Sequence, residues 1–245
     1  MSDYTESHKV LLTYIRSCRY VEQSELLGNF VLICNAYNIQ SPSNELLDNY
    51  IGTINSRISH QMFKIDRKKH EVTGDLYYIF INTTPNESIK QSTTYSPVEL
   101  DAIKGLIDSI IEAPDFKYSI GKSNAQRSIA STLNRSLAET SAFITELVDE
   151  GWFTITLQER LLLSIKSLCE LKTYLIDRYG IYSTESDGKI LICAQCKELV
   201  TLGFISVSDN PLSFHRTCYD VYCRNNNVDP DESSLCQVGP DPTTI

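Results

Sequence analysis

The chain has 245 residues, a formal net charge of −9 at pH 7 and an ordinary apolar share of 42%. This length accommodates one large domain or two to three small ones. We expect no membrane span, because no run of about eighteen apolar residues occurs. The acidic balance excludes DNA binding by bulk electrostatics, since phosphate neutralisation needs clustered Lys and Arg. Any DNA contact is therefore expected to be weak, local or made through partners.

The cysteines are expected to act as thiols or metal ligands before disulfides. Residues 1–8 are polar and lack the apolar core of a secretory signal, which makes an intracellular, reducing compartment the default expectation. Disulfides are rare in such a compartment. Three of the eight cysteines, Cys18, Cys34 and Cys169, fall on apolar helical faces and are expected to be small core residues.

The first third of the chain predicts three helices followed by a β-hairpin. Apolar residues recur at helical spacing over residues 10–15, 26–34 and 47–58. After residue 62 the apolar period changes to two, which predicts strands near 63–65 and 76–81 joined by a polar loop. Three helices closed by a two-stranded hairpin form the winged-helix arrangement.

The same order of elements returns about ninety residues later. Ser96 and Glu99 have the spacing of a capping box and predict a helix start, with an inward apolar stripe up to Ile111. Further elements are expected in the order helix, helix, strand and long helix, at residues 124–134, 139–150, 152–155 and 159–178. This pattern predicts a second winged helix with an added C-terminal helix.

The sequence therefore predicts an α+β protein with two tandem winged-helix domains, at residues 1–90 and 91–184. A small zinc-bound module is expected at 185–224, introduced by a short strand at 189–192. The polar residues 225–245 are expected to form a disordered tail.

Four residues of the third segment form a metal-binding pattern, Cys193-x2-Cys196-x18-His215-x2-Cys218. A two-residue spacing lets both side chains of a pair face one ion, and Cys3His is a common closed tetrahedral zinc set. Residues 189–224 are too few to fold by apolar burial alone, whereas structural zinc contributes on the order of 10 kcal/mol to such modules. We therefore predict one structural zinc ion and no catalytic residue, because four protein ligands leave no open position for water.

Two more cysteines, Cys223 and Cys236, follow this pattern. They are expected to be free thiols in a loose tail. The alternative is that they supply two ligands to another zinc ion, but no histidine lies near them.

A basic cluster on the first hairpin is the best candidate for nucleic-acid contact. It consists of Lys64, Arg67, Lys68 and Lys69, and wings often touch phosphates. The alternative is a solvated hairpin, which the acidic background favours.

Taken together, the order of these segments resembles the non-SMC element 1 family, the RING-like subunit of the five/six-type SMC complex. The stretches that carry the resemblance span nearly the whole chain and lie at residues 49–56, 77–82, 96–111, 148–153 and 189–196. The resemblance implies a nuclear, chromosome-associated subunit that acts in DNA repair and recombination. It also implies a MAGE-type and a kleisin subunit as partners, and a ubiquitin-conjugating enzyme if the RING-like module is active.

The family pattern has eight zinc ligands in the order C4HC3, and this chain departs from it. By position, Cys193 and Cys196 match the first pair, and His215 and Cys218 match the third, which together make one site. The segment expected to hold the second pair, 199–210, contains no Cys or His, and the fourth pair includes Cys236 at most. The resemblance therefore implies a variant RING-like module that keeps one zinc site.

Three functions remain open at this point. The first is an interaction subunit of the complex with a structural zinc module. The second is a working RING-type E3 ubiquitin ligase. It is weakened by the missing ligands and by Ala194 and Gln195, where a ligase usually has a hydrophobic residue. The third is a winged-helix DNA-binding protein outside any such complex.

Overall fold

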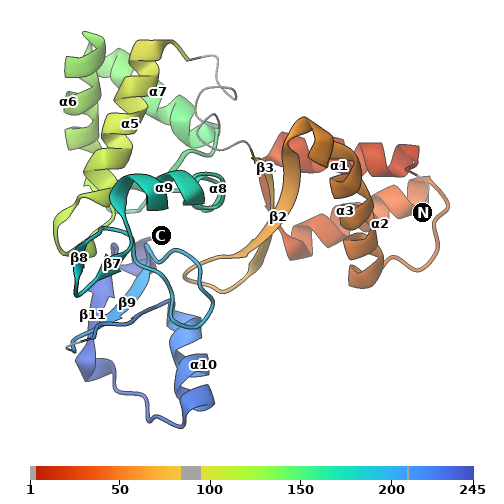
Figure 1. Ribbon diagram of the computed structural model, residues 1–245. Helices are drawn as coiled ribbons and strands as arrows, with labels where there is room; N and C mark the ends of the chain where they lie inside the picture. The colour runs from red at the N-terminus through yellow and green to blue at the C-terminus, as the bar shows by residue number, and fades with distance from the viewer. Residues whose placement is uncertain (1–3, 84–94, 209) are drawn as a thin grey trace. The chain divides into compact units, whose positions relative to one another are not determined.

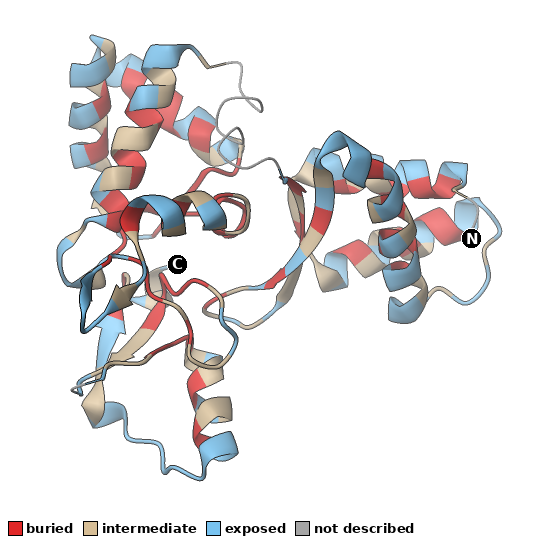
Figure 2. Ribbon diagram, viewed as in Figure 1, coloured by how far each residue is buried: buried red, intermediate tan, exposed pale blue. Residues whose placement is uncertain are grey.

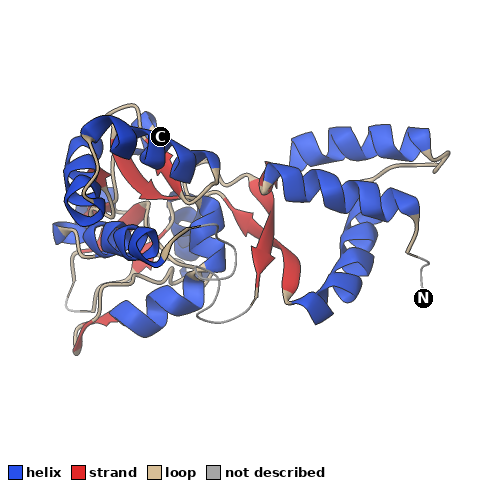
Figure 3. Ribbon diagram, turned by 90° about the horizontal axis from the view of Figure 1, so that it is seen from above, coloured by secondary structure: helices blue, strands red, loops and turns tan. Residues whose placement is uncertain are grey.

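A computed structural model describes residues 4–83, 95–208 and 210–245. The chain forms two compact units (Figure 1). The first comprises Met1–His70 and Asp75–Ser88, and the second comprises Glu71–Gly74 and Ile89–Ile245. Helices and small antiparallel sheets occur in both units (Figure 3), which confirms the predicted α+β class.

The first unit contains the three predicted helices. Their bounds are α1, Glu6–Cys18; α2, Gln23–Ala36; and α3, Asn44–Ile58, which is followed by the 3-10 turn η1, Ser59–Gln61. Helix α3 begins after Ser43, whose hydroxyl accepts a hydrogen bond from the Leu46 amide at 3.2 Å. Helix α2 has already ended at Ala36, so the polar stretch around Pro42 connects the two helices and supplies the cap of α3 through Ser43.

A three-stranded antiparallel sheet closes the first winged helix, in the order β1-β3-β2. The strands are β1, Tyr20–Glu22; β2, Phe63–Lys69; and β3, Leu76–Asn82. In the hairpin, Ile65 faces Phe80, and β1 adds a third strand by placing Tyr20 opposite Ile79. The sequence did not predict β1, because three residues are too few to show an apolar period.

The core of the first unit lies where the helices meet the sheet. Its members include Leu11, Leu26, Phe30, Leu47, Ile54 and Tyr78, which are all fully buried. Buried positions alternate with exposed ones along the helices (Figure 2), as the apolar spacing predicts. Burial of each large side chain contributes about 1.5–3 kcal/mol to the stability of the fold. The first unit therefore has a hydrophobic core of its own.

The second unit begins with another winged helix. Its helices are α5, Pro97–Ile111; α6, Lys122–Leu133; and α7, Leu137–Asp149. The capping box at α5 is confirmed: Ser96 accepts from the Glu99 amide, and the Glu99 carboxylate accepts from the Ser96 amide at 2.9 Å. A second capping box, formed by Ser136 and Glu139, starts α7. A 3-10 turn, η2, Pro114–Phe116, and the short strand β4, Ile120–Gly121, lie between α5 and α6.

The predicted long helix at 159–178 is wrong. The structure instead forms β6, Arg160–Leu163, followed by α8, Ile165–Glu170, and α9, Lys172–Tyr179. Strand β6 pairs with β5, Phe153–Ile155, and with β4. Leu161, Leu162 and Leu163 are all buried. A short apolar run buried on both faces looks the same in a strand and in a helix, so periodicity alone cannot distinguish them.

The C-terminal segment packs onto the same core. Buried residues on both sides of residue 184, among them Leu175, Ile190, Leu191 and Val238, belong to one hydrophobic cluster. The predicted strand at 189–192 is reduced to isolated bridges, in which Ile190 pairs with Ile181 and Ile192 pairs with Leu199. The boundaries at 90 and 184 stay predictions.

The prediction of a disordered tail at 225–245 is wrong. After α10, Arg216–Asn226, the chain forms the 3-10 turns η3, Glu232–Ser234, and η4, Pro242–Thr244, with β11, Leu235–Val238, between them. Strand β11 pairs with β9, Gly203–Ser206, which also pairs with β10, Ser213–Phe214. A ribbon of two short strands, β7, Tyr182–Ser183, and β8, Ser186–Asp187, precedes this sheet. Polar composition suggested disorder, but backbone hydrogen bonds to β9 order the segment.

Among the helices formed by residues 4–83, 95–208 and 210–245, none has the length and apolar character that crossing a bilayer requires.

Candidate metal centre

The first ligand pair lies in a tight turn. The Lys197 amide donates to the Cys193 carbonyl at 3.0 Å, and the Cys193 amide donates to the Glu198 carbonyl at 2.8 Å. Lys197 adopts a φ of 62°, in the left-handed region that permits a sharp reversal of the chain. The reversal brings the side chains of Cys193 and Cys196 to the same side of the turn.

The second pair lies at the start of α10. His215 is the N-cap residue, and Cys218 follows in the first turn, where its amide donates to the His215 carbonyl at 3.0 Å. Residues three apart at a helix start face the same side. The ends of β10 and α10 therefore present one imidazole and one thiol toward the Cys193 turn.

The four predicted ligands meet in one cluster. The sulfur atoms of Cys193, Cys196 and Cys218 and one ring nitrogen of His215 all lie within 4.8 Å of one another. The Nδ1 atom of His215 is 3.3 Å from the Cys196 sulfur and 3.7 Å from the Cys218 sulfur. A tetrahedral zinc ion with ordinary Zn–S and Zn–N bonds separates such ligands by roughly 3.5 Å. The cluster can hold a metal ion, and its donor set is consistent with zinc.

Hydrogen bonding determines which nitrogen of His215 faces the metal site. The Nε2 atom lies 2.9 Å from the Leu199 carbonyl oxygen and 3.2 Å from Oε1 of Glu71. Both oxygens accept, so Nε2 carries the hydrogen and donates it. Nδ1 is then the metal-binding atom, and it is the nitrogen that points at the sulfur atoms.

The electrostatics of the cluster favour a thiolate. A hydrogen bond with the Cys196 thiol lowers the pKa of Cys193 below its ordinary value, and the same contact raises the pKa of Cys196. Burial opposes the charged form of His215, but hydrogen bonds with Cys193, Cys196 and Glu71 raise its pKa above the ordinary value. A metal ion that binds here replaces the protons of these side chains, as thiolate and imidazole ligands require.

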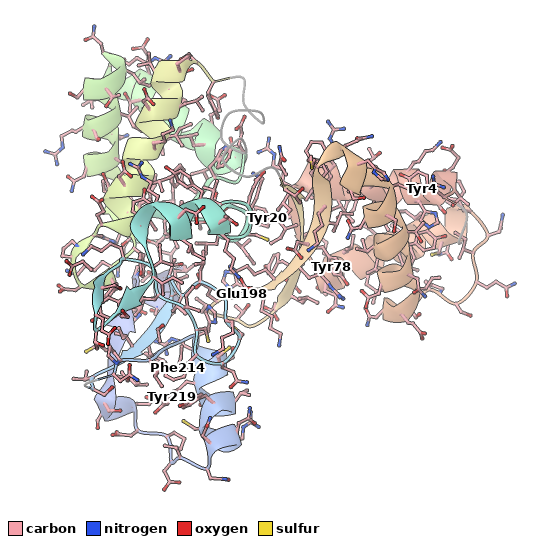
Figure 4. The ribbon with its side chains drawn as sticks, viewed as in Figure 1. Tyr4, Tyr20, Tyr78, Glu198, Phe214 and Tyr219 are labelled. Atoms are coloured by element: carbon pink, nitrogen blue, oxygen red, sulfur yellow. The ribbon has the colours of Figure 1, made fainter. Side chains whose placement is uncertain are left out.

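A small core supports α10 beside the cluster. Phe214, Tyr219 and Cys223 are buried together, and Ala194 packs against them. The rings of Phe214 and Tyr219, labelled in Figure 4, are 5.4 Å apart in an edge-on arrangement. This core has three buried members, whereas Cys193 belongs to the larger core of the second unit, against which Cys218 packs. Helix α10 therefore has little apolar support of its own.

Cys223 and Cys236 do not lie in a loose tail. Cys223 is buried on α10, and Cys236 is exposed on β11. Within the described ranges, the single group of three or more potential metal ligands is the one around His215. Of the predicted core cysteines, Cys34 is buried, whereas Cys18 and Cys169 are partly exposed.

The basic residues of the first hairpin all lie on β2. Lys64 pairs with Asp66 and Arg67 pairs with Asp48, each at 3.0 Å. Lys68 is buried, whereas Lys69 is exposed. Acidic neighbours thus offset part of the charge that a phosphate contact needs, and nucleic-acid binding by these residues stays a prediction.

Glu71 is the site residue that sequence reasoning missed. It follows β2 in the chain, about 140 residues before the ligand His215 that it contacts, and no local motif includes it. Only the tertiary fold shows that its carboxylate belongs beside His215.

Comparisons with known proteins identify the family. The family model described as "Nse1 non-SMC component of SMC5-6 complex" matches residues 8–171. Non-structural maintenance of chromosomes element 1 of Schizosaccharomyces pombe is 21% identical over 222 residues, covering 89% of this chain and 85% of that protein. The homolog of Xenopus tropicalis is 21% identical over 220 residues, covering 89% of this chain and 77% of the homolog.

A solved structure shows the same fold. A chain from a structure titled "Nse1-Nse3-Nse4 complex" superimposes with a TM-score of 0.76 at 19% identity, covering 91% of this chain and 93% of that one. The family model ends at residue 171, before the first metal ligand. The metal cluster is therefore identified by the positions of its side chains and not by this match. Because that model matches more than half of the sequence, the chain belongs to the Nse1 family of non-SMC components of the SMC5-6 complex.

Proposed function

We propose that this chain acts in DNA repair and recombination as a nuclear subunit of an SMC5-6 complex, where it binds a MAGE-type and a kleisin subunit. Family membership carries this proposal. It is supported by the solved chain of similar fold, whose title places it in a complex with Nse3 and Nse4. Winged helices are compact platforms with exposed faces, which suits a subunit whose role is to bind other subunits.

Affinity purification of the tagged full-length protein from its source cells tests the assembly. We expect mass spectrometry to recover a MAGE-type protein, a kleisin and SMC subunits in comparable amounts, and the tag alone to recover none. Recovery of neither a MAGE-type protein nor a kleisin contradicts the proposal.

We also propose that the Cys3His cluster holds one structural zinc ion. The four ligand atoms lie together. Four protein ligands would complete the tetrahedral shell of a structural zinc ion, which would leave no position for a metal-bound water and no hydrolytic role. When bound, the ion would link two segments of the chain, because its ligands come from the Cys193 turn and from the start of α10. Its expected contribution is to folding.

A structural role for this module is better supported than independent ubiquitin-ligase activity. A RING ligase holds a charged conjugating enzyme in a rigid groove between two cross-braced zinc loops. In the described residues, one ligand set comes together, and Ala194 packs inward against the core beside α10. Discharge of ubiquitin from a charged conjugating enzyme by the wild type, abolished by Cys193→Ser, would show that ligase activity is retained.

A further inference from the structure

Glu71 makes an unusual set of contacts for a loop residue. Its side chain is buried, and it belongs to the same compact unit as the metal cluster. Oε1 accepts a hydrogen bond from the Thr201 amide at 2.8 Å, and Oε2 accepts one from the Thr201 hydroxyl at 2.6 Å. Oε1 also lies 3.2 Å from Nε2 of His215. A buried carboxylate is costly unless it is hydrogen-bonded, and these contacts to the metal module stabilise it.

The geometry around His215 is that of a ligand held by an outer carboxylate. Histidines that bind a metal through one nitrogen usually donate the other N–H to a carboxylate or a carbonyl, which fixes the ring and raises its basicity. Here Nε2 has both kinds of acceptor, Glu71 and the Leu199 carbonyl, while Nδ1 points at the sulfur atoms. Loss of such an outer carboxylate typically lowers metal affinity by about 10–100-fold.

The rest of the loop also lies against the ligand-bearing helix. Gly74 has a φ of +78°, and a Cβ atom at this position would lie 3.3 Å from the Thr217 side chain. Thr217 lies between the ligands His215 and Cys218 in the first turn of α10. The loop Glu71–Gly74 therefore contacts the segment that carries the ligands in two places. Glu71 makes a polar contact with His215, and Gly74 packs closely against Thr217.

We propose that Glu71 is the outer carboxylate of the metal site and that metal binding and the docking of Glu71–Gly74 stabilise each other. Glu71 positions His215 so that Nδ1 faces the ion, and the ion holds the imidazole that Glu71 binds. Such coupling is reciprocal: whatever Glu71 adds to metal affinity, the metal adds to the docking of the loop. This inference rests on the zinc binding proposed above.

The first test measures zinc affinity of full-length wild type, Glu71→Gln and Glu159→Gln by competition with a chromogenic chelator. Glutamine keeps the size of the side chain and removes its charge. Glu159 is the matched control, because its carboxylate lies in the same unit, pairs with Lys122 at 3.3 Å, is exposed and lies outside the ligand cluster. We expect Glu71→Gln to lose about tenfold or more in affinity, and Glu159→Gln to keep the wild-type value.

The outcomes separate this inference from the proposal of zinc binding. A smaller loss in Glu71→Gln, or an equal loss in Glu159→Gln, overturns the role of Glu71 while the wild type still holds zinc. A wild type that binds no zinc overturns the zinc proposal itself, and this inference with it.

A second measurement needs no variant and therefore does not depend on Glu71→Gln folding. Hydrogen exchange of wild-type protein is compared before and after zinc removal by a chelator, in peptides that contain Glu71–Gly74. We expect faster exchange there in the zinc-free protein, because His215 no longer holds the carboxylate in place. Unchanged exchange in these peptides, with zinc loss verified by mass, overturns the coupling.

Discussion

Replacing Cys193 with serine is expected to abolish zinc binding and to disorder α10 and the turn at Cys193. Structural zinc contributes on the order of 10 kcal/mol to the folding of small modules, whereas the local core beside α10 has three buried members. The first unit has a separate core and is expected to keep its fold. Hydrogen exchange by mass spectrometry measures both regions at once, and metal analysis measures the bound zinc.

Cys236→Ser is the matched control for this experiment. Cys236 is exposed on β11 and lies outside the ligand cluster, so its replacement is expected to change neither zinc content nor exchange. Protection of α10 in Cys193→Ser equal to that of wild type would contradict a structural role for the metal.

Gly203→Ala is expected to destabilise the sheet of β9, β10 and β11 by about 1–3 kcal/mol. A Cβ atom at Gly203 would lie 2.1 Å from the carbonyl oxygen of Phe214. This atom belongs to the backbone, so only separation of β9 from β10 relieves the clash. His215 directly follows Phe214, and the same shift displaces a metal ligand. We therefore expect both a lower midpoint for urea unfolding of the second unit and weaker zinc binding.

Gly105→Ala is the matched control in the same unit, because the added methyl group is expected to cause no clash. Gly105 lies within α5, and a Cβ atom there meets no other group within 4 Å. Alanine is favoured over glycine in a helix by about 0.8–1.0 kcal/mol, so this variant is expected to be slightly more stable than wild type. If the two variants unfold at the same urea concentration, the packing of Gly203 against Phe214 described here is wrong.

Much of the fold could be predicted because its signals are local. The helices of both winged helices follow from apolar spacing and from capping residues such as Ser96 and Glu99, which act within a few residues. The metal ligands are predictable for a similar reason. Each pair has a two-residue spacing, so the chain itself brings Cys193 to Cys196 and His215 to Cys218.

The predictions that are wrong concern segments whose structure is determined by tertiary contacts and not by the local pattern of apolar and polar residues. Strand β6 contains Leu161, Leu162 and Leu163, which are all buried because both faces of the strand are covered. Three consecutive leucines show no apolar period, so the sequence alone does not distinguish this strand from a helix. Strand β11 is ordered by pairing with β9 about thirty residues away, although the surrounding composition is that of a disordered tail.

Glu71 illustrates the same limit at the metal site. Nothing in its immediate sequence distinguishes it from an exposed acidic residue in a turn. The Glu71 carboxylate can act on the metal site because it is buried beside Thr201 and His215. These residues come together only in the folded chain.

Native mass spectrometry of the purified full-length protein tests the single metal site, because it counts the metal ions bound to each chain. A single Cys3His cluster predicts one zinc ion per chain, released when the protein is denatured in acid. Two tightly bound zinc ions would contradict the account and restore the case for a cross-braced, catalytically active RING. A protein that folds fully without zinc would contradict the structural role assigned to the cluster.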